Sequence, residues 1–343
     1  MSTSDFRSDT VTQPSDAMRE AMARAVVGDD VLDGDPTVRE LEDETARWLG
    51  KARALFVPSG TMANQVALGA WTRPGDEIIV QRHAHVTTYE AGAPGYLHGL
   101  QSITVGGIDG AMDPAEVEAA IRPDYVHCPK TGLVCLEQTH NVAGGRIAPL
   151  TELEAVARVA RESGVPVHMD GARLANAVVA TGIPAERWAQ SADSVSVCLS
   201  KGLGAPVGSL IAGDEEFIER GIVVRKRLGG WMRQAGVIAA GGLYALRHNL
   251  ERLAEDHALA RTLASRLNAL PGLAADPDSV ATNIVMAEVQ TDRFDAAALA
   301  ARMRTEGVLV LVFGKRVLRF VTHMDVGAED VARVESVLRG ILA

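Results

Sequence analysis

Short apolar runs alternate with longer stretches whose apolar residues have helical spacing along the first two thirds of this chain. Between residues 52 and 212 the short runs predict strands and the longer stretches predict helices. Such an alternation is typical of an α/β unit built on a mostly parallel sheet. We expect strands at 52–57, 77–81, 102–105, 132–137, 166–170 and 194–200, and helices at 62–71, 114–121 and 151–163.

Two segments depart from this alternation. The run at 207–212 follows residue 201 too closely for a helical crossover, so we expect it to pair antiparallel with its neighbours. Before residue 52, start signals at Pro14 and Ser15 predict one helix, and Thr37 precedes a second that covers 38–49. The segments at 5–15 and 28–36 are polar or rich in turn residues, which indicates irregular structure.

The pattern changes near Gly241. A long helix is predicted over 235–267, bent or broken at Gly241-Gly242, and the remaining elements form a compact α+β unit of ordinary domain size. We therefore divide the chain into a large domain, 1–245, and a small C-terminal domain, 246–343. The small domain is expected to contain strands at 283–289, 308–313 and 317–322 and helices at 295–306 and 328–342.

Composition limits the class of protein. The chain has 343 residues, 47% hydrophobic and 23% charged, which is an ordinary mix for a two-domain globular protein. A net charge of −10 argues against nucleic acid or an anionic membrane as partner. The N-terminus lacks the apolar core of a signal peptide, and no run reaches the ~18 apolar residues of a membrane span. Three cysteines without metal spacing fit a reducing compartment, so we expect a cytoplasmic protein.

Lys201 is the strongest chemical signal. It follows the apolar strand at 194–200 and precedes a Gly-Leu-Gly turn, while Asp170 ends the strand at 166–170. Active sites in parallel sheets lie at the carboxyl ends of strands. A lysine that forms a Schiff base and an acid that pairs with a pyridine nitrogen are what pyridoxal phosphate (PLP) requires. This pair predicts a PLP site.

A phosphate site is predicted where the strand at 52–57 meets the next helix. Ser59, Gly60 and Thr61 form a tight loop there, and backbone N–H groups at a helix start attract a phosphate. The same residues also serve as an ordinary helix cap. His83 and His85 have the spacing of metal ligands, but no third ligand follows at a known spacing, so we assign no metal.

With these residues placed, the chain resembles the low-specificity L-threonine aldolases of the fold-type I PLP-dependent enzymes, whose fold is aspartate-aminotransferase-like. The resemblance runs nearly end to end and rests on the order and spacing of its motifs. These are 6–14, 27–31, 35–37, 59–64, 137–141, Asp170-Gly-Ala-Arg173, 199–204, Met232-Arg-Gln234 and 319–323.

The resemblance implies the following cofactor contacts. Lys201 carries PLP, Asp170 pairs with its ring nitrogen, and His85 stacks on the ring, with Arg173 close by. The phosphate ligands are expected to be Ser59, Gly60, Thr61, Lys226 and Arg233, the last two from a neighbouring subunit.

The resemblance also implies how an amino-acid substrate is held. Ser8, Arg173 and Arg319 bind its carboxylate, His127 lies near its β-hydroxyl, and Glu90 orients a water there. The implied reaction is the reversible cleavage of β-hydroxy-α-amino acids to glycine and an aldehyde, in a homotetramer built as a dimer of dimers. His85, His127 or a bound water remain alternatives for the base.

Two departures from the family pattern bear on substrate preference. Leu32 stands where many members have tyrosine, and Trp231 replaces a glycine. Two other functions stay open. The first is another PLP reaction on the same scaffold, such as β-elimination or transamination, and the second is a catalytically silent binding protein.

Overall fold

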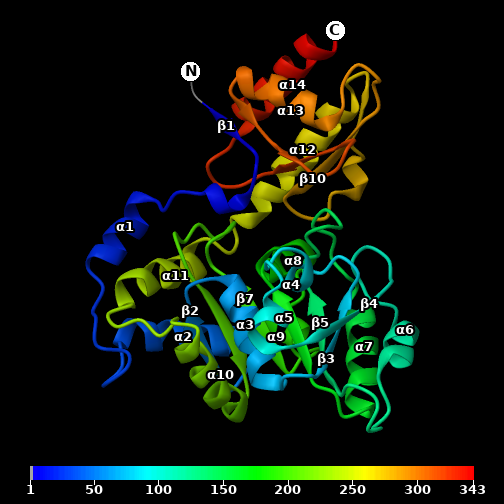
Figure 1. Cartoon of the computed structure of the whole chain (residues 1–343). Coiled ribbons are helices and arrows are strands. Elements are labelled where there is room, and N and C mark those ends of the chain that lie inside the picture. Colours follow the sequence, from blue (N-terminus) through cyan, green and yellow to red (C-terminus); the bar gives the residue numbers. More distant parts are fainter. Residues whose placement is uncertain (1–2) are drawn as a thin grey trace.

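The computed structural model describes residues 3–343, and a seven-stranded sheet forms its centre (Figure 1). The strand order is β2-β8-β7-β6-β5-β3-β4, and β8 alone runs antiparallel to its neighbours. This confirms the α/β class and the antiparallel run after Lys201. The strands are β2 (Arg53–Val57), β3 (Glu77–Gln81), β4 (Gln101–Val105), β5 (Thr131–Glu137), β6 (Val167–Gly171), β7 (Ser194–Cys198) and β8 (Ser209–Gly213).

Helices cover the sheet, and the strands between them are buried along their whole length in β3, β5, β6, β7 and β8. Burial on both faces explains why these strands read as unbroken apolar runs. The helices are α2 (Pro36–Leu49), α3 (Gly60–Trp71), α4 (His85–Thr88), α5 (Ala93–His98), α6 (Pro114–Ala120), α7 (Leu150–Glu162), α8 (Leu174–Thr181), α9 (Ala185–Ala189), α10 (Glu215–Arg227) and α11 (Gly236–His248).

The C-terminal elements build a second, smaller layer above one end of the sheet (Figure 1). Their four-stranded antiparallel sheet has the order β12-β13-β10-β9 and its own apolar core. The elements are α12 (Leu253–Asn268), β9 (Leu273–Ala274), η2 (Pro277–Ser279), β10 (Ile284–Val289), α13 (Ala296–Thr305), β11 (Val308–Leu309), β12 (Leu311–Val312), β13 (Val317–Val321) and α14 (Ala328–Leu342).

The N-terminal segment connects the two parts. Strand β1 (Ser4–Asp5) pairs with β11, and Phe6 belongs to the apolar core of the C-terminal elements. The chain then forms a short 3-10 helix, η1 (Asp9–Val11), before α1 (Asp16–Ala23) packs on α11. The division at residue 245 stays a prediction.

Two local expectations were wrong. The long helix is interrupted between α11 and α12, at residues 249–252, and not at Gly241-Gly242. Both glycines lie buried inside α11, where an added Cβ on Gly242 would come within 2.5 Å of the Leu199 side chain, so they serve close packing. The strand expected at 308–313 is two short strands, because Val310 separates a pair with β1 from a pair with β13.

The six parallel strands, β2 to β7, deliver their carboxyl ends to one edge of the sheet. That edge faces the N-terminal segment and the C-terminal elements. Within residues 3–343, the helices are all too short or too polar to cross a membrane.

Candidate functional site

A cavity of about 660 Å³ opens at this edge of the sheet. Its walls come from the N-terminal segment, from loops after the strands and from the segment around β12. The lining residues are Ser8, Thr10, His85, Tyr89, Asn141, Val142, Arg173, Lys201, Leu311, Val312, Phe313, Gly314 and Arg319. A cavity of similar size, about 670 Å³, lies at the opposite edge near Trp71, but no lysine or histidine lines it.

Lys201 lies in the turn three residues after β7 and reaches into the cavity. Its backbone carbonyl accepts hydrogen bonds from Gly204 N at 2.8 Å and from Thr12 Oγ1 at 3.2 Å. The amine itself has no hydrogen-bond or ion-pair partner among residues 3–343. The structure therefore fixes the backbone of this lysine and leaves its nucleophile available.

Asp170 is a buried carboxylate in the centre of the sheet, between Glu137 of β5 and Ser196 of β7. Its Oδ1 accepts a hydrogen bond from Ala172 N at 3.0 Å, and its Oδ2 accepts one from Asn64 Nδ2 at 2.8 Å. Burial raises its pKa, but the charges of His85 and Lys201 and the Asn64 hydrogen bond outweigh it and lower the pKa. Asp170 is thus an anion.

His85 begins helix α4, just after β3. Its Nδ1 lies 3.0 Å from Glu90 Oε1, and its backbone N–H donates to Glu137 Oε2 at 2.7 Å. Burial lowers the pKa of His85, yet the hydrogen bond to Glu90 and the charge of Asp170 outweigh it and raise the pKa. Glu90 is buried and also accepts from Asn64 and Gln65, so it holds the imidazole in place.

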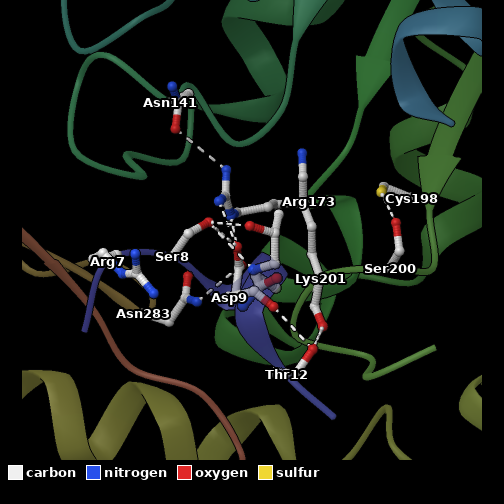
Figure 2. A network of polar contacts seen from close by, with 12 residues as sticks. Arg7, Ser8, Asp9, Thr12, Asn141, Arg173, Cys198, Ser200, Lys201 and Asn283 are labelled. Atoms are coloured by element: carbon white, nitrogen blue, oxygen red, sulfur yellow. Dashed lines mark hydrogen bonds and ion pairs between the residues drawn. The ribbon is translucent and has the colours of Figure 1, made fainter. Parts of the chain in front are cut away.

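Arg173 forms the strongest ion pair at the site, shown in Figure 2. Its Nε and Nη2 donate to the two oxygens of Asp9, at 2.9 and 2.7 Å, and Asn283 Nδ2 donates to Asp9 Oδ2 at 3.2 Å. Burial raises the pKa of Asp9, but Arg173 outweighs it and holds the pKa well below its usual range. This bidentate geometry leaves Nη1 of Arg173 to point away from Asp9, toward Asn141 at 3.3 Å.

Arg319 comes from β13 and meets Arg173 at Asn141, whose Oδ1 accepts from Arg319 Nη1 at 2.9 Å. Burial and the nearby charge of Arg173 lower the pKa of Arg319 to about 10, so it remains a cation at neutral pH. Its Nε is buried without a partner in the described chain. Two guanidinium groups with unused donors converge on the cavity, which suits an anionic ligand.

The loop predicted to bind a phosphate lies at the carboxyl end of β2. Ser59 is the N-cap of α3, and its hydroxyl accepts from Met62 N at 3.2 Å. A Cβ added to Gly60 would lie 3.7 Å from Ser209 Oγ, a buried hydroxyl with no partner in the described chain. An unused hydroxyl beside the exposed N–H groups of a helix start fits a phosphate.

Three predicted site residues lie away from the rest of the site within one chain. Lys226 and Arg233 lie on the surface, Lys226 over the ring of Trp231 and Arg233 paired with Asp29 at 3.1 Å. His127 is exposed in the loop 121–130, which precedes β5 and therefore lies at the opposite end of that strand. The expected roles of these three residues remain predictions.

Several residues of the site carried no individual role in the sequence. Asp9, Asn64 and Asn141 occur inside motifs, but their local sequence predicts no role for them. Their roles come from contacts with segments that are far away along the chain. Asp9 and Arg173 are separated by 164 positions. The sequence predicts only a strand at 311–313, and the fold shows that this apolar segment lines the same cavity as Lys201.

The side chains at this edge fit PLP. The amine of Lys201 is available, the anion of Asp170 is fixed by hydrogen bonds, and the start of α3 offers unused donors. His85, Glu90 and Asp170 place ligating atoms within 4.8 Å of one another, a spacing that a cation can use. Asn64 Nδ2, however, donates to both carboxylates, and an N–H donor between them opposes a cation.

Comparisons with known proteins agree with this geometry. The model of the β-eliminating lyase family matches residues 5–292. A protein of Arabidopsis thaliana named low-specificity L-threonine aldolase 1 is 45% identical over 332 residues, 95% of this chain and 93% of its own. The low specificity L-threonine aldolase of Escherichia coli strain K12 is 43% identical and covers 99% of both chains.

The fold also matches solved structures. A threonine aldolase of Leishmania major superimposes with a TM-score of 0.82 over 99% of both chains, at 21% sequence identity. This match confirms the fold-type I arrangement of a mostly parallel sheet with C-terminal α+β elements. By sequence over nearly its full length, the chain belongs to the β-eliminating lyase family and, within it, to the low-specificity L-threonine aldolases.

Proposed function

We propose that this chain is a PLP-dependent lyase that cleaves L-threonine, L-allo-threonine and related β-hydroxy-α-amino acids to glycine and an aldehyde, reversibly. One observation carries the proposal. A lysine amine that has no partner among residues 3–343 and an anionic aspartate follow neighbouring strands, beside two arginines that face the same cavity. Membership in the threonine aldolases gives the reaction class.

Different residues would bind different parts of the cofactor. PLP, when bound, supplies an electron sink for the bond that breaks at the substrate α-carbon. Lys201 would hold it covalently, and the anion of Asp170 would keep a proton on the ring nitrogen. Ser59, Gly60, Thr61 and the start of α3 would bind the phosphate, and His85 would lie against the ring.

The substrate carboxylate is assigned to Arg319, Arg173 and Ser8. Asp9 occupies the Nε and Nη2 donors of Arg173, so only the remaining donors reach a ligand in the cavity. Arg319 brings a buried Nε without a partner in the described chain. Charge-assisted contacts from two sides fix the orientation of an amino acid as well as its affinity.

His85 is the base that the geometry favours for the β-hydroxyl proton. Its Nδ1 is engaged by Glu90, which leaves Nε2 on the side of the cavity. A raised pKa means that the neutral imidazole accumulates only above the usual histidine value of about 6.5. His127 and a water held by Glu90 remain alternatives, and His127 would have to reach the cavity from another subunit.

A second candidate function is β-elimination, because the family model that matches the chain is that of β-eliminating lyases. Both reactions would use Lys201 and Asp170 and differ in which substrate bond is held perpendicular to the ring. Release of acetaldehyde and glycine from threonine supports the first proposal. Release of pyruvate and ammonia from serine would favour the second.

We further propose a homotetramer, a dimer of dimers, in which Lys226 and Arg233 reach the phosphate of the neighbouring subunit. Three apolar side chains, Val26, Val27 and Leu32, are 70%, 42% and 75% exposed on the segment that contacts Arg233 through Asp29. Exposed apolar groups of this size support a subunit interface there. The three unpaired cysteines support a cytoplasmic location.

The deciding experiment measures aldehyde release by the purified protein from L-threonine and L-allo-threonine, with and without added PLP. Lys201→Ala is expected to abolish turnover and to abolish covalent retention of PLP after borohydride reduction, measured by mass spectrometry. No aldehyde from either substrate would overturn the proposed reaction. Covalent PLP retained in Lys201→Ala would overturn the assignment of the lysine.

A further inference from the structure

Asn64 is the fifth residue of α3, and its side chain lies between the two carboxylates of the site. It is 2% exposed. Its Nδ2 donates to Asp170 Oδ2 at 2.8 Å and to Glu90 Oε1 at 2.8 Å. A primary amide has two N–H bonds, so each carboxylate receives one. A single side chain therefore connects the acid predicted for the ring nitrogen with the acid that holds His85.

The other end of the amide is fixed by a directional chain of hydrogen bonds. Trp71 Nε1 can only donate, and it donates to Ser194 Oγ at 2.9 Å. Ser194 Oγ lies 3.0 Å from His168 Nδ1, and His168 Nε2 lies 3.1 Å from Asn64 Oδ1. Because both N–H groups of Asn64 face carboxylates, its Oδ1 must accept, which places the proton of neutral His168 on Nε2 and lets Nδ1 accept from Ser194 Oγ.

These contacts agree with the orientation that the two carboxylates impose on the amide. Burial lowers the pKa of His168 to about 4, so at neutral pH the ring has one N–H, the one given to Asn64 Oδ1. Ser196 Oγ donates to the same oxygen at 3.2 Å. A flipped amide would place its N–H groups against two donors and its oxygen against two anions, so only one orientation satisfies all partners.

We propose that Asn64 is a positioning residue for the reaction, holding Asp170 and the Glu90–His85 pair in one geometry through its two N–H bonds. The proposal rests on the proposed function. Glu90 Oε1 accepts both Asn64 Nδ2 and the proton of His85 Nδ1, which assigns the Nδ1–H tautomer to neutral His85. Its Nε2 then carries the lone pair into the cavity.

The choice of an amide has an electrostatic reason. The ligating atoms of His85, Glu90 and Asp170 lie within 4.8 Å of one another, so two anions repel at short range. A lysine or arginine between them would neutralise Asp170 and compete with a protonated ring nitrogen. A neutral amide donates to both anions and leaves their charge in place.

Gln65 provides a matched control because it is the next residue of the same helix and equally buried. Its Nε2 donates to Glu90 Oε2 at 2.6 Å, and none of the described contacts joins it to Asp170. Asn64→Leu removes support from both acids, whereas Gln65→Leu removes it from Glu90 alone. Asn64→Asp keeps the shape of the side chain and replaces the N–H donors, which covers the case in which Asn64→Leu fails to fold.

The experiment measures the Kd for PLP on the apoprotein and the pH midpoint of kcat/KM. Both Asn64 variants are expected to raise the Kd roughly ten- to hundred-fold, because a hydrogen bond to a buried anion is lost. Gln65→Leu is expected to stay within roughly threefold of wild type in Kd and to shift only the pH midpoint.

Equal Kd values in the Asn64 and Gln65 variants would overturn the proposal, since Asn64 would then give no support to Asp170. An unchanged pH midpoint in the Asn64 variants would overturn the link to His85. The Kd comparison does not depend on turnover. If wild-type protein binds PLP but releases no aldehyde, the proposed function fails while the role of Asn64 at the cofactor is still decided.

Discussion

Single residues of this site owe their chemistry to partners that bury them and fix their charge. Asp9 shows this most clearly. At the start of a short helix an aspartate is ordinarily solvated, but here it is fully buried and receives two donors from Arg173 and one from Asn283. An ion pair of this kind is costly to break, because the remaining partner keeps an unpaired buried charge.

Arg319→Ala is expected to raise KM for threonine roughly ten- to hundred-fold, since a charge-assisted contact to the substrate carboxylate is lost. Steady-state kinetics on threonine measure this. Arg316→Ala is the control, because Arg316 immediately precedes β13 and does not line the cavity. Its Nη1 donates a hydrogen bond to Phe294 O at 3.1 Å. An unchanged KM in Arg319→Ala would place the carboxylate elsewhere.

Asp9→Asn is expected to lower the free energy of unfolding by about 3–5 kcal/mol, because Arg173 loses its anion in a buried site. Since the pKa of Asp9 is lowered on folding, its contribution is present above the unfolded value of about 3.9 and is lost as the pH falls below it. Urea unfolding at several pH values should show a smaller acid loss in the variant than in wild type.

Asp5→Asn is the control for this experiment. Asp5 pairs with Arg7 in the same segment, but both side chains are partly exposed, so we expect a change below about 1 kcal/mol. Equal destabilisation by the two substitutions would mean that the buried Asp9–Arg173 pair contributes no more to the free energy of unfolding than an exposed ion pair.

At the scale of elements, the junctions between strands and helices prepare the site. The start of α3 combines a Ser59 cap, an open approach at Gly60 and the Ser209 hydroxyl from β8, which has no partner in the described part of the chain. A buried hydroxyl without a partner costs free energy unless a ligand satisfies it. The junction of β2, α3 and β8 therefore has the character of a prepared anion site.

Ser209→Ala is expected to weaken PLP binding roughly three- to tenfold while leaving the stability of the apoprotein equal or slightly higher. Fluorescence titration and thermal unfolding of the apoprotein measure the two effects. Ser191→Ala is the control, because Ser191 Oγ is also buried without a partner in the described chain but precedes β7, at the other edge of the sheet. A Kd that changes equally in both variants would contradict a specific phosphate contact.

At the scale of the whole molecule, one chain leaves two expected phosphate ligands on its surface. Lys226 and Arg233 flank Trp231, whose indole donates to Asp30 Oδ2 at 2.7 Å. The hydrogen bond to Asp30 therefore holds the Trp231 side chain against the loop at residues 28–35. The proposal that a neighbouring subunit receives these two cations can be tested without a structure of the assembly.

Mixing inactive Lys201→Ala with Arg233→Ala, after dissociation and reassociation, is expected to restore about a quarter of wild-type activity. Half of the randomly formed dimers are mixed, and each has one complete site if the arginine acts across an isologous interface. Activity of the mixture and of each variant alone measures this. No recovery would mean that Arg233 acts within its own chain, and full activity of Arg233→Ala alone would mean that it does not act at the site.

The sequence by itself determined the central fold and predicted the residues at the chemical core of the site. The positions of β2 to β8 follow from local apolar periodicity, and Lys201, Asp170 and the Ser59 loop follow from their places at strand ends, because both signals act over short stretches of chain. The resemblance to threonine aldolases is carried by motifs in the same way, and the family comparisons confirm it.

Only the tertiary structure decided the contacts between distant segments. Asp9 meets Arg173, Asn64 meets Asp170, and β1 pairs with β11. The continuity of α11 through Gly241-Gly242 and the split between β11 and β12 also depend on neighbours in space, since Gly242 packs against Leu199 and β11 pairs with β1. The local sequence pattern indicates which side of a strand or helix is buried. The residue that packs against that side comes from a distant segment, and the topology of the whole chain determines which segment that is.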